Sequence, residues 1–364
     1  MSEQASKTIV ERIDLGRLDA ESDKNLPEYF LDTGTVDLVR QGKQLVVGRK
    51  GAGKTALFTF LATELDPVIE LDLDDYVWQF HRGLAEVGLQ PERAFTTSWK
   101  LLIYLSAYSA IRDRLGQDGR KRADGALKAL GLGADRGRIK AMVDWLARVR
   151  RVDMPEVVGV FSGGGFEVAD PAEGNLSAEA TRAIHELEDV LVEARQKIPF
   201  TVMIDRLDDA WDGSEESLNM IAGAVRATRE AALTLDGPPP APVVTFLRTD
   251  LWDRISFNDR NKMSQDILFL DWSTDELADV VALRIARSLE TRQEEAWATA
   301  FTTEEMRQRA SARTYMTKRA LGRPRDIVAF AIFAREEAQR SGNDVIEASD
   351  IYDAEQRFLA APFR

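Results

Sequence analysis

The sequence predicts an α/β fold in which a parallel sheet core carries a large helical insertion and a C-terminal all-α lid. Three observations support this prediction. Over residues 43–73 an apolar run, a glycine-rich loop, a helical segment and a second apolar run follow one another, as in a β-α-β unit with parallel strands. About 125 residues of mostly helical pattern then precede the next core strand, at 200–205. From Ser273 onward, every segment has helical periodicity.

Local patterns define the individual elements. Short apolar or β-branched runs predict buried strands at 43–48, 67–73, 200–205, 243–247 and 267–270. Apolar residues at helical spacing predict helices at 54–65, 99–111, 139–149, 178–197, 215–235, 322–340 and 348–359. A further helix is predicted to begin at Ser273, which forms a capping pattern with Glu276. Two strand-like runs, 157–161 and 166–168, flank a glycine-rich turn and predict a hairpin within the insertion.

The length of 364 residues favours two domains, or one large domain with insertions. We divide the chain into a polar N-terminal arm at 1–23, an α/β core at 24–272 and an α-helical lid at 273–364. The helical, partly basic insertion occupies about 74–198 of the core. No run approaches the roughly eighteen apolar residues of a membrane span, and residues 1–11 lack the hydrophobic stretch of a secretory signal. We therefore expect a cytoplasmic protein that does not contact membranes.

Cysteine and histidine usage narrows the possible chemistry. The chain has no cysteine, which excludes disulfides, thiolate metal sites and cysteine nucleophiles and is typical of a reducing compartment. Only two histidines occur, His81 and His185, which disfavours a histidine-built metal site or a Ser-His-Asp triad. Catalysis is therefore expected to depend on carboxylates, lysine, arginine, backbone amides or a bound cation.

The charge of the chain is unevenly distributed. Its net charge of −13 disfavours general nucleic-acid binding. Residues 111–151, however, contain twelve lysines or arginines against five aspartates, a local charge of +7 that leaves −20 on the remainder. We interpret this basic segment either as a contact for DNA, RNA or an acidic protein, or as a surface that docks on the acidic core of the same or a neighbouring subunit.

The glycine-rich loop after the first predicted strand fits the phosphate-binding pattern G-x-x-x-x-G-K-[ST] at every fixed position, and it lies between a strand and a helix as that motif requires. Its glycines let backbone N–H groups close around phosphate oxygens at a helix N-terminus. The lysine supplies a cation for the β- and γ-phosphates, and the threonine hydroxyl is a hard oxygen ligand for Mg²⁺. The predicted nucleotide-binding residues are Gly48, Arg49, Lys50, Gly51, Ala52, Gly53, Lys54 and Thr55.

Three aspartates mark the end of the predicted strand at 200–205. Asp205 stands at its carboxyl end, where ligands of open α/β sheets bind, and is predicted to hold Mg²⁺ together with Thr55. Either Asp208 or Asp209 is predicted to orient and deprotonate the attacking water. Asp209 is slightly favoured, because motifs of the form D-x-x-D-[DE] place the base last. The alternative for this pair is that one of them caps the next helix.

Four segments occur in the order found in AAA+ and STAND-type ATPases: 48–55, 205–209, 246–250 (Phe-Leu-Arg-Thr-Asp) and 322–325 (Gly-Arg-Pro-Arg). The Asp-x-Leu-Asp-Asp element is similar to the KAP, NACHT and STAND variants. Over about 15–63 and 199–358, the chain resembles bacterial P-loop ATPases of this branch, which often occur in mobile or defence-associated gene neighbourhoods. The resemblance implies a P-loop NTPase fold that binds ATP and Mg²⁺.

The resemblance also implies roles for arginines. Arg248 would be the sensor 1 residue, which contacts the γ-phosphate or the attacking water. Its alternative is a structural ion pair with Asp250 or Asp253. Arg325 would be the sensor 2 residue, which reaches the phosphates from the lid, and Arg323 is the alternative for that role. Arginine suits both positions because its planar fork binds phosphate oxygens in pairs.

AAA+ rings receive an arginine finger from a neighbouring subunit, and Arg254 and Arg260 are the candidates here. The combined features predict an Mg²⁺-dependent ATPase that acts as a molecular switch or assembly subunit. We expect it to be a homo-oligomer that regulates a separate effector protein in bacterial antiphage defence. The alternatives are an ATP-dependent DNA-binding protein of initiator or clamp-loader type and, with weaker support, a P-loop kinase of a small metabolite.

Overall fold

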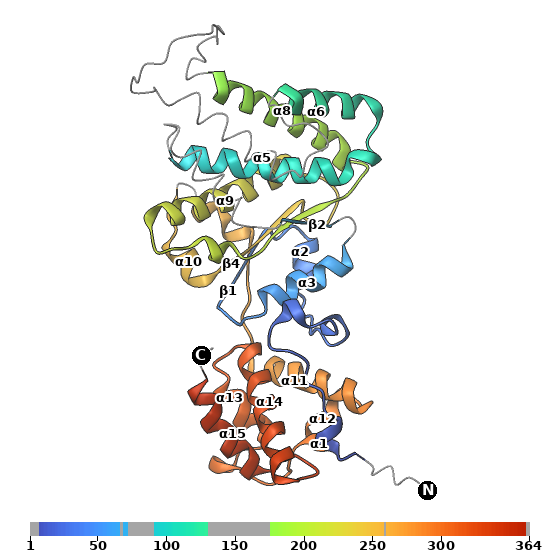
Figure 1. The fold of residues 1–364 in the computed structure, drawn as a ribbon, viewed down its shortest axis with the longest axis vertical. Helices are drawn as coiled ribbons and strands as arrows, with labels where there is room; N and C mark the ends of the chain where they lie inside the picture. Colours follow the sequence, from blue (N-terminus) through green and yellow to red (C-terminus); the bar gives the residue numbers. More distant parts are fainter. Residues whose placement is uncertain (1–6, 66–67, 72–90, 130–174, 258–259, 362–364) are drawn as a thin grey trace, which may run out of the picture. The chain divides into compact units, whose positions relative to one another are not determined.

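The computed structural model describes residues 7–65, 68–71, 91–129, 175–257 and 260–361 (Figure 1). The chain forms two compact units, each assembled from separate stretches of sequence. The first unit contains residues 1–36, 47–64 and 269–364, and the second contains 37–46 and 65–268. The segment that carries the glycine-rich loop thus belongs to the same unit as the C-terminal helices.

The core of the fold is a five-stranded sheet of order β2-β3-β4-β1-β5. Its strands are β1 (Leu45–Gly48), β2 (Val68–Leu71), β3 (Thr201–Ile204), β4 (Val243–Arg248) and β5 (Ile267–Phe269). β2, β3 and β4 are parallel neighbours, with Ile69 opposite Val202 and Met203 opposite Val244. Every residue of β1 and β3 is buried, as in strands whose two faces are both covered. The predicted α/β fold is thus confirmed. The predicted hairpin at 157–168 and the predicted helix at 139–149 lie outside the described residues.

Helices of the second unit pack on the sheet in successive layers (Figure 1). α5 (Pro91–Ile111) contacts β2, β3 and α9 (Glu215–Thr234), and α9 contacts β4. α8 (Asn175–Arg195) packs on α5 and on α6 (Gln117–Ala129). The predicted insertion therefore supplies α5 directly to the cover of the sheet. None of the described helices is long and apolar enough to cross a membrane.

α5 and α9 approach each other closely. A Cβ atom added to Gly223 of α9 would lie 2.6 Å from the Cβ atom of Phe95 in α5, so only glycine fits at this crossing. Nearby, the fully buried Trp99 of α5 donates its indole N–H to the Met220 carbonyl at 3.1 Å. These contacts fasten the insertion to the core, because α9 lies outside the insertion in the sequence.

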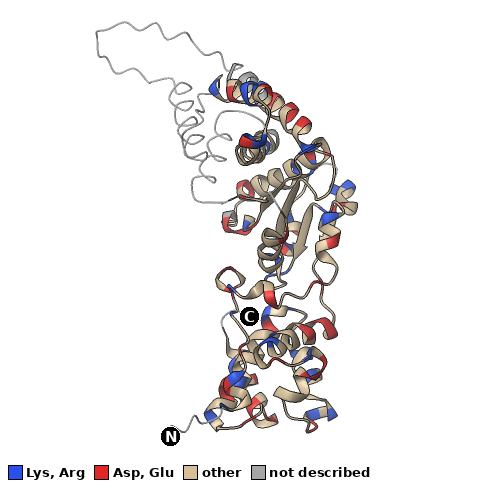
Figure 2. Ribbon diagram, turned by 90° about the vertical axis from the view of Figure 1, so that its right-hand side faces the viewer, with Lys and Arg blue, Asp and Glu red and all other residues tan. Residues whose placement is uncertain are grey.

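In the described part of the basic segment, residues 111–129, two arginines pair with carboxylates of the same unit. Arg112 forms two hydrogen bonds with Asp124, the shorter at 2.7 Å. Arg122 on α6 pairs with Glu186 at 3.3 Å and Glu193 at 2.9 Å, both on α8. Figure 2 shows that both signs of charge alternate along these helices. Within 111–129, these two basic side chains thus serve contacts inside the helical insertion.

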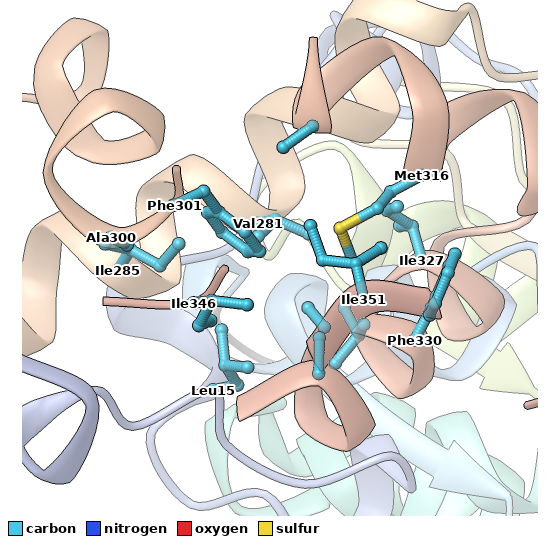
Figure 3. Close-up of a cluster of buried hydrophobic side chains, with 14 of the residues drawn as sticks. Leu15, Val281, Ile285, Ala300, Phe301, Met316, Ile327, Phe330, Ile346 and Ile351 are labelled. Carbon is cyan, nitrogen blue, oxygen red and sulfur yellow. The ribbon is translucent and has the colours of Figure 1, made fainter. Parts of the chain in front are cut away.

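The first unit has its hydrophobic core between the C-terminal helices (Figure 3). These helices are α11 (Thr274–Leu289), α12 (Gln293–Ala300), α13 (Ala312–Arg319), α14 (Pro324–Ser341) and α15 (Ala348–Ala360). α11 begins with the predicted capping box, in which the Ser273 hydroxyl and the Glu276 carboxylate accept each other's backbone N–H. Phe330 of α14 stacks on Phe358 of α15 with ring centroids 5.1 Å apart. The predicted all-α C-terminal region is thus confirmed.

The N-terminal segment is part of this same core. Val10 of α1 (Ile9–Arg12), together with Ile13 and Leu15, is buried in the hydrophobic cluster of the C-terminal helices. Arg335 donates to the Ile13 carbonyl at 2.8 Å, and Arg284 donates to the Leu15 carbonyl at 2.6 Å. The segment predicted as a polar arm therefore has buried apolar positions and is held by arginines of α11 and α14.

The N-terminal segment also reaches α3 (Lys54–Glu64), the helix that follows the glycine-rich loop. Two 3₁₀ turns, Ala20–Ser22 and Leu26–Glu28, contact α3. Phe30 stacks on Phe60 of α3 with ring centroids 4.3 Å apart. Within the first unit, the N-terminal segment thus connects α3 to the C-terminal helices. In the sequence, this segment is followed by α2 (Thr35–Arg40) and then by β1.

Candidate functional site

The glycine-rich loop lies between β1 and the first turn of α3, in the position that the sequence predicts. Gly51 and Gly53 have φ angles of +85° and +95°, a region that residues with side chains rarely adopt. The loop is closed by a turn in which the Ala52 N–H donates to the Arg49 carbonyl at 3.0 Å. The glycines are therefore required by the backbone path and not only by the motif.

The side chains of the loop differ in their surroundings. The ammonium group of Lys54, at the start of α3, donates to the carbonyls of Gly48 at 3.1 Å and Arg49 at 3.4 Å. Thr55 is half-buried in the first turn of α3, whereas Arg49 and Lys50 are exposed. The loop thus curls around the lysine ammonium, which places this cation beside the backbone that would surround a phosphate.

Residues from the C-terminal part of the chain hold the loop from one side. Three hydrogen bonds join them: Trp272 Nε1 to the Ala52 carbonyl (2.8 Å), the Arg325 backbone N–H to the Gly51 carbonyl (3.3 Å), and Arg49 Nη1 to the Leu321 carbonyl (3.3 Å). All of these residues belong to the first unit. The loop conformation therefore depends on backbone and side-chain groups that come more than 200 residues later in the sequence.

Arg325 is the predicted sensor arginine that lies against the loop. A Cβ atom placed on Gly51 would be 3.2 Å from Arg325 Nε and 3.4 Å from Cζ. Burial lowers the pKa of Arg325, and the nearby charge of Arg323 acts in the same direction, whereas Asp326 raises it. A partly dehydrated guanidinium group beside this glycine-rich loop is well suited to pair with an anion, because the anion would restore the favourable electrostatics that burial removes.

Arg323, the alternative to Arg325, is engaged in the helix that it precedes. Its Nε and Nη2 atoms lie 2.6 and 2.5 Å from one carboxylate oxygen of Asp326. Asp326 is fully buried in the first turn of α14 and needs a cationic partner there. The geometry therefore gives Arg323 a structural ion pair and leaves Arg325 as the arginine in contact with the loop.

The predicted acidic cluster lies in the second unit, after β3. Asp205 is buried, with 8% of its surface exposed. The chain then turns sharply at Arg206, whose φ of +63° is unusual for a residue with a side chain. Asp208 and Asp209 follow in a 3₁₀ helix, Leu207–Ala210. Neither of them caps the next α-helix, because Ser214 is the N-cap of α9, so the capping alternative is wrong.

Each of the two candidate bases has its own arginine. Arg248, at the end of β4, forms a two-pronged contact with Asp250 at 3.0 and 2.8 Å, and its Nη1 atom lies 3.5 Å from Asp208. Burial lowers the pKa of Arg248, but the hydrogen bonds and charges of the two aspartates outweigh it, so the pKa is raised overall. Arg206 donates to Asp209 at 2.8 Å. The alternative predicted for Arg248, an ion pair with Asp250, is therefore present. Arg248 also forms an ion pair with Asp208, one of the two candidate bases.

The two arginine-finger candidates contact tryptophans of their own unit. The guanidinium group of Arg254 lies over the Trp211 ring at 5.0 Å. Arg260 lies over the Trp252 ring at 4.3 Å and donates to the Trp252 carbonyl at 2.8 Å. Arg254 is exposed and Arg260 is half-buried, so Arg254 is the one of the two that a neighbouring molecule can reach more readily.

The C-terminal helices match a known family. The FunZ-associated C-terminal helical domain matches residues 275–362. This domain contains Arg323 and Arg325 but not Trp272 or the glycine-rich loop. No curated protein matches the chain. The matched range thus includes Leu321 and Arg325, which contact the loop, and leaves the α/β part to be interpreted from its own residues.

Sequence reasoning missed Trp272, which lies three residues before the range that matches the FunZ-associated domain. Trp272 has no motif around it, and its indole contact with Ala52 joins positions 220 residues apart. Only the apolar character of Trp272 and its place between β5 and α11 were visible in the sequence. A long-range hydrogen bond of this kind has no local signal.

The described residues contain no group of three or more histidines or carboxylates that could hold a metal ion without further ligands. Nucleotide-bound Mg²⁺ takes most of its ligands from phosphates and water and needs only one or two protein oxygens. The donors predicted from the sequence, the Thr55 hydroxyl and the buried Asp205 carboxylate, are hard oxygens of this kind. Their chemistry therefore fits Mg²⁺ that arrives with a nucleotide.

Proposed function

We propose that the chain binds and hydrolyses ATP with Mg²⁺ and works as a molecular switch. The observation that carries this proposal is the glycine-rich loop. It has the complete G-x-x-x-x-G-K-[ST] pattern and lies between a strand and a helix, with two glycines at positive φ and Arg325 against it. A chance match of the motif would not be expected to have this backbone context.

In this proposal the loop N–H groups and Lys54 bind the phosphates, and Arg325 adds a second cation from the C-terminal helices. Thr55 and Asp205 would hold Mg²⁺, which supplies charge neutralisation at the β- and γ-phosphates when bound. Asp208 or Asp209 would accept a proton from the attacking water. The place of Asp205 directly after β3 supports its part of this assignment, because ligands of open α/β sheets bind beyond the carboxyl ends of the strands.

Arg248 would link hydrolysis to conformational change. It contacts Asp208 and Asp250 in the described structure, and a γ-phosphate or its attacking water would compete for the same guanidinium group. Loss of the phosphate after hydrolysis would return Arg248 to these carboxylates. The switch would then be read by other molecules through the FunZ-associated domain or by self-association, and Arg254 is the candidate for contact with a neighbouring copy.

The biological part of the proposal is regulation of a separate effector in bacterial antiphage defence. It is supported by the sequence resemblance to defence-associated P-loop ATPases. It is also consistent with a chain in which we find no nuclease, protease or deaminase motif. The alternative of an ATP-dependent DNA-binding protein receives no support from residues 111–129, where Arg112 and Arg122 pair with carboxylates of the same unit.

The test is ATP binding and phosphate release by the purified full chain. Lys54→Ala should abolish nucleotide binding, whereas Lys24→Ala, which removes an exposed lysine outside the loop, should leave it unchanged. Asp209→Asn should retain ATP while turnover falls by about a hundredfold or more. Full turnover in Asp209→Asn would move the base to Asp208, and absence of ATP binding by the unaltered chain would overturn the proposal.

Mass photometry with and without an ATP analogue and with DNA tests the assembly part separately. A nucleotide-dependent increase in mass is expected for a switch that works through self-association. A monomer under every condition would reject this part of the proposal. Strong stimulation of hydrolysis by DNA would instead favour the initiator-type alternative.

A further inference from the structure

Trp272 occupies the short connection between β5 and α11 and contacts the loop and the C-terminal helices at once. Its half-buried ring packs against the hydrophobic cluster of the C-terminal helices. Its indole N–H donates to the Ala52 carbonyl at 2.8 Å. The ring also lies beside the next residue of the loop, since Cζ2 is 3.6 Å from the position that a Cβ atom would take on Gly53. The Trp272 side chain thus lies against two consecutive loop residues, Ala52 and Gly53.

The hydrogen bond to Ala52 has a consequence for the next amide. The Ala52 carbonyl and the Gly53 N–H belong to one planar trans peptide, so they point in opposite directions. When the indole holds the carbonyl, the Gly53 N–H is directed to the other side of the loop, away from Trp272. Gly53 follows with a φ of +95°, and a glycine peptide with no neighbouring side chain to restrain it rotates easily.

The preceding peptide plane is held in the same way. The Arg325 backbone N–H donates to the Gly51 carbonyl at 3.3 Å, and the Ala52 N–H of that plane donates to the Arg49 carbonyl at 3.0 Å. Two successive peptide planes in a glycine-rich segment are therefore fixed by groups from the C-terminal part of the first unit. Neither contact uses the charge of the arginine, so this support is separate from the proposed phosphate-binding role of Arg325.

We propose that Trp272 is a positioning residue that aims the Gly53 amide at the phosphates of the nucleotide. This inference rests on the proposed ATP-binding function and adds how the loop is kept in its binding shape. It also implies a form of regulation, because any partner that displaces the C-terminal helices from the loop would release the Ala52 carbonyl and lower nucleotide affinity. The helices that match the FunZ-associated domain would then control the loop through Trp272, three residues before the matched range.

The chain offers a matched control for this role. Trp297 is also half-buried, packs against the same hydrophobic cluster, and donates its indole N–H to a backbone carbonyl, that of Ala278, at 3.0 Å. Its hydrogen bond joins α12 to α11, and its ring stacks on Phe301 with ring centroids 4.5 Å apart. Trp272→Phe and Trp297→Phe therefore remove the same kind of hydrogen bond from the same hydrophobic core and differ in whether the loop loses its support.

The experiment compares the two variants with the unaltered chain in binding of a non-hydrolysable ATP analogue and in steady-state hydrolysis. Trp272→Phe should weaken analogue binding about fivefold or more, as expected for the loss of one hydrogen bond, and should raise KM with a smaller change in kcat. Trp297→Phe should change neither quantity by more than about twofold. Equal binding by the Trp272→Phe variant and the unaltered chain would overturn the inference.

Hydrogen–deuterium exchange without nucleotide provides a readout that does not depend on ATP binding. Trp272→Phe should accelerate exchange of the Ala52 amide, which is hydrogen-bonded within the loop turn, and Trp297→Phe should not. If the unaltered chain binds no ATP but the loop exchange rises in Trp272→Phe, the proposed function fails while the loop support stands. If loop exchange is unchanged in Trp272→Phe, the loop support fails. Trp272→Tyr replaces the phenylalanine variant in both assays if that variant does not fold.

Discussion

Truncation of Ile13 to alanine tests whether the N-terminal segment belongs to the core of the C-terminal helices. Ile13 is 2% exposed and lies in the same cluster as Leu277 and Phe330. The three lost carbons correspond to about 2.4 kcal/mol of transfer free energy. The cavity that they leave raises the expected loss to about 3 kcal/mol, within the range of about 2–5 kcal/mol for large-to-small changes in well-packed cores.

Because the chain has two compact units, a single unfolding midpoint is not a clean measure of this change. Hydrogen–deuterium exchange of the most protected α14 amides gives the free energy of opening of the first unit itself. The control is Arg17→Ala, whose side chain is 64% exposed and forms a surface ion pair with Asp19, so that its loss should cost less than about 0.5 kcal/mol. A loss below about 1 kcal/mol in Ile13→Ala, or one no larger than in Arg17→Ala, would refute the assignment of the N-terminal segment to this core.

Two further predictions concern the loop and the C-terminal helices. Gly51→Ala should weaken binding of an ATP analogue about tenfold or more in calorimetry, because a side chain is strained at φ +85° and would press on Arg325. The control is Gly34→Ala, which has a similar φ of +86° but open space around it. This control should lower stability without changing analogue binding. The pKa of Glu337 is lowered from its usual 4.5, chiefly by the hydrogen bond from Arg357. Its contribution to stability is therefore complete above pH 4.5 and is lost as the pH falls through the lower folded-state pKa. The free energy of opening measured by hydrogen exchange of the α14 amides should therefore drop more steeply below pH 4.5 in the unaltered chain than in Glu337→Gln. Parallel curves would contradict this.

The elements that the sequence predicted well are those whose signals are local. The strand, loop and helix around Gly48–Thr55 follow from neighbouring residues, and the Ser273 capping box is made by positions three residues apart. Helix ends were less predictable. α5 begins at Pro91 instead of near residue 99, because proline is favourable in the first turn, where its missing N–H is not needed. Likewise, Ser214 and not an aspartate of 208–209 caps α9.

Contacts between distant positions explain what the sequence did not predict. The short spacing of Val10, Ile13 and Leu15 gives no hint that their partners are the C-terminal helices, so the sequence alone predicts a polar arm. The choice between Arg323 and Arg325 likewise depended on the surroundings of each side chain. The buried Asp326 forms an ion pair with Arg323, whereas the loop lies against Arg325. For the candidate site, the sequence thus predicts the kinds of groups, and the packing decides which of them meet.

The division of the first unit into distant stretches of chain has a consequence for its synthesis. The Val10 N–H donates to the carbonyl of Asp344, which leaves the ribosome more than 300 residues later. At about 5–20 residues per second, the apolar N-terminal positions wait roughly 20 to 70 s for their partners. During that time the second unit can complete its own core, while Val10, Ile13 and Leu15 remain available to chaperones. A nascent chain stalled before α11 should therefore be more sensitive to protease at its N-terminal segment than the finished protein.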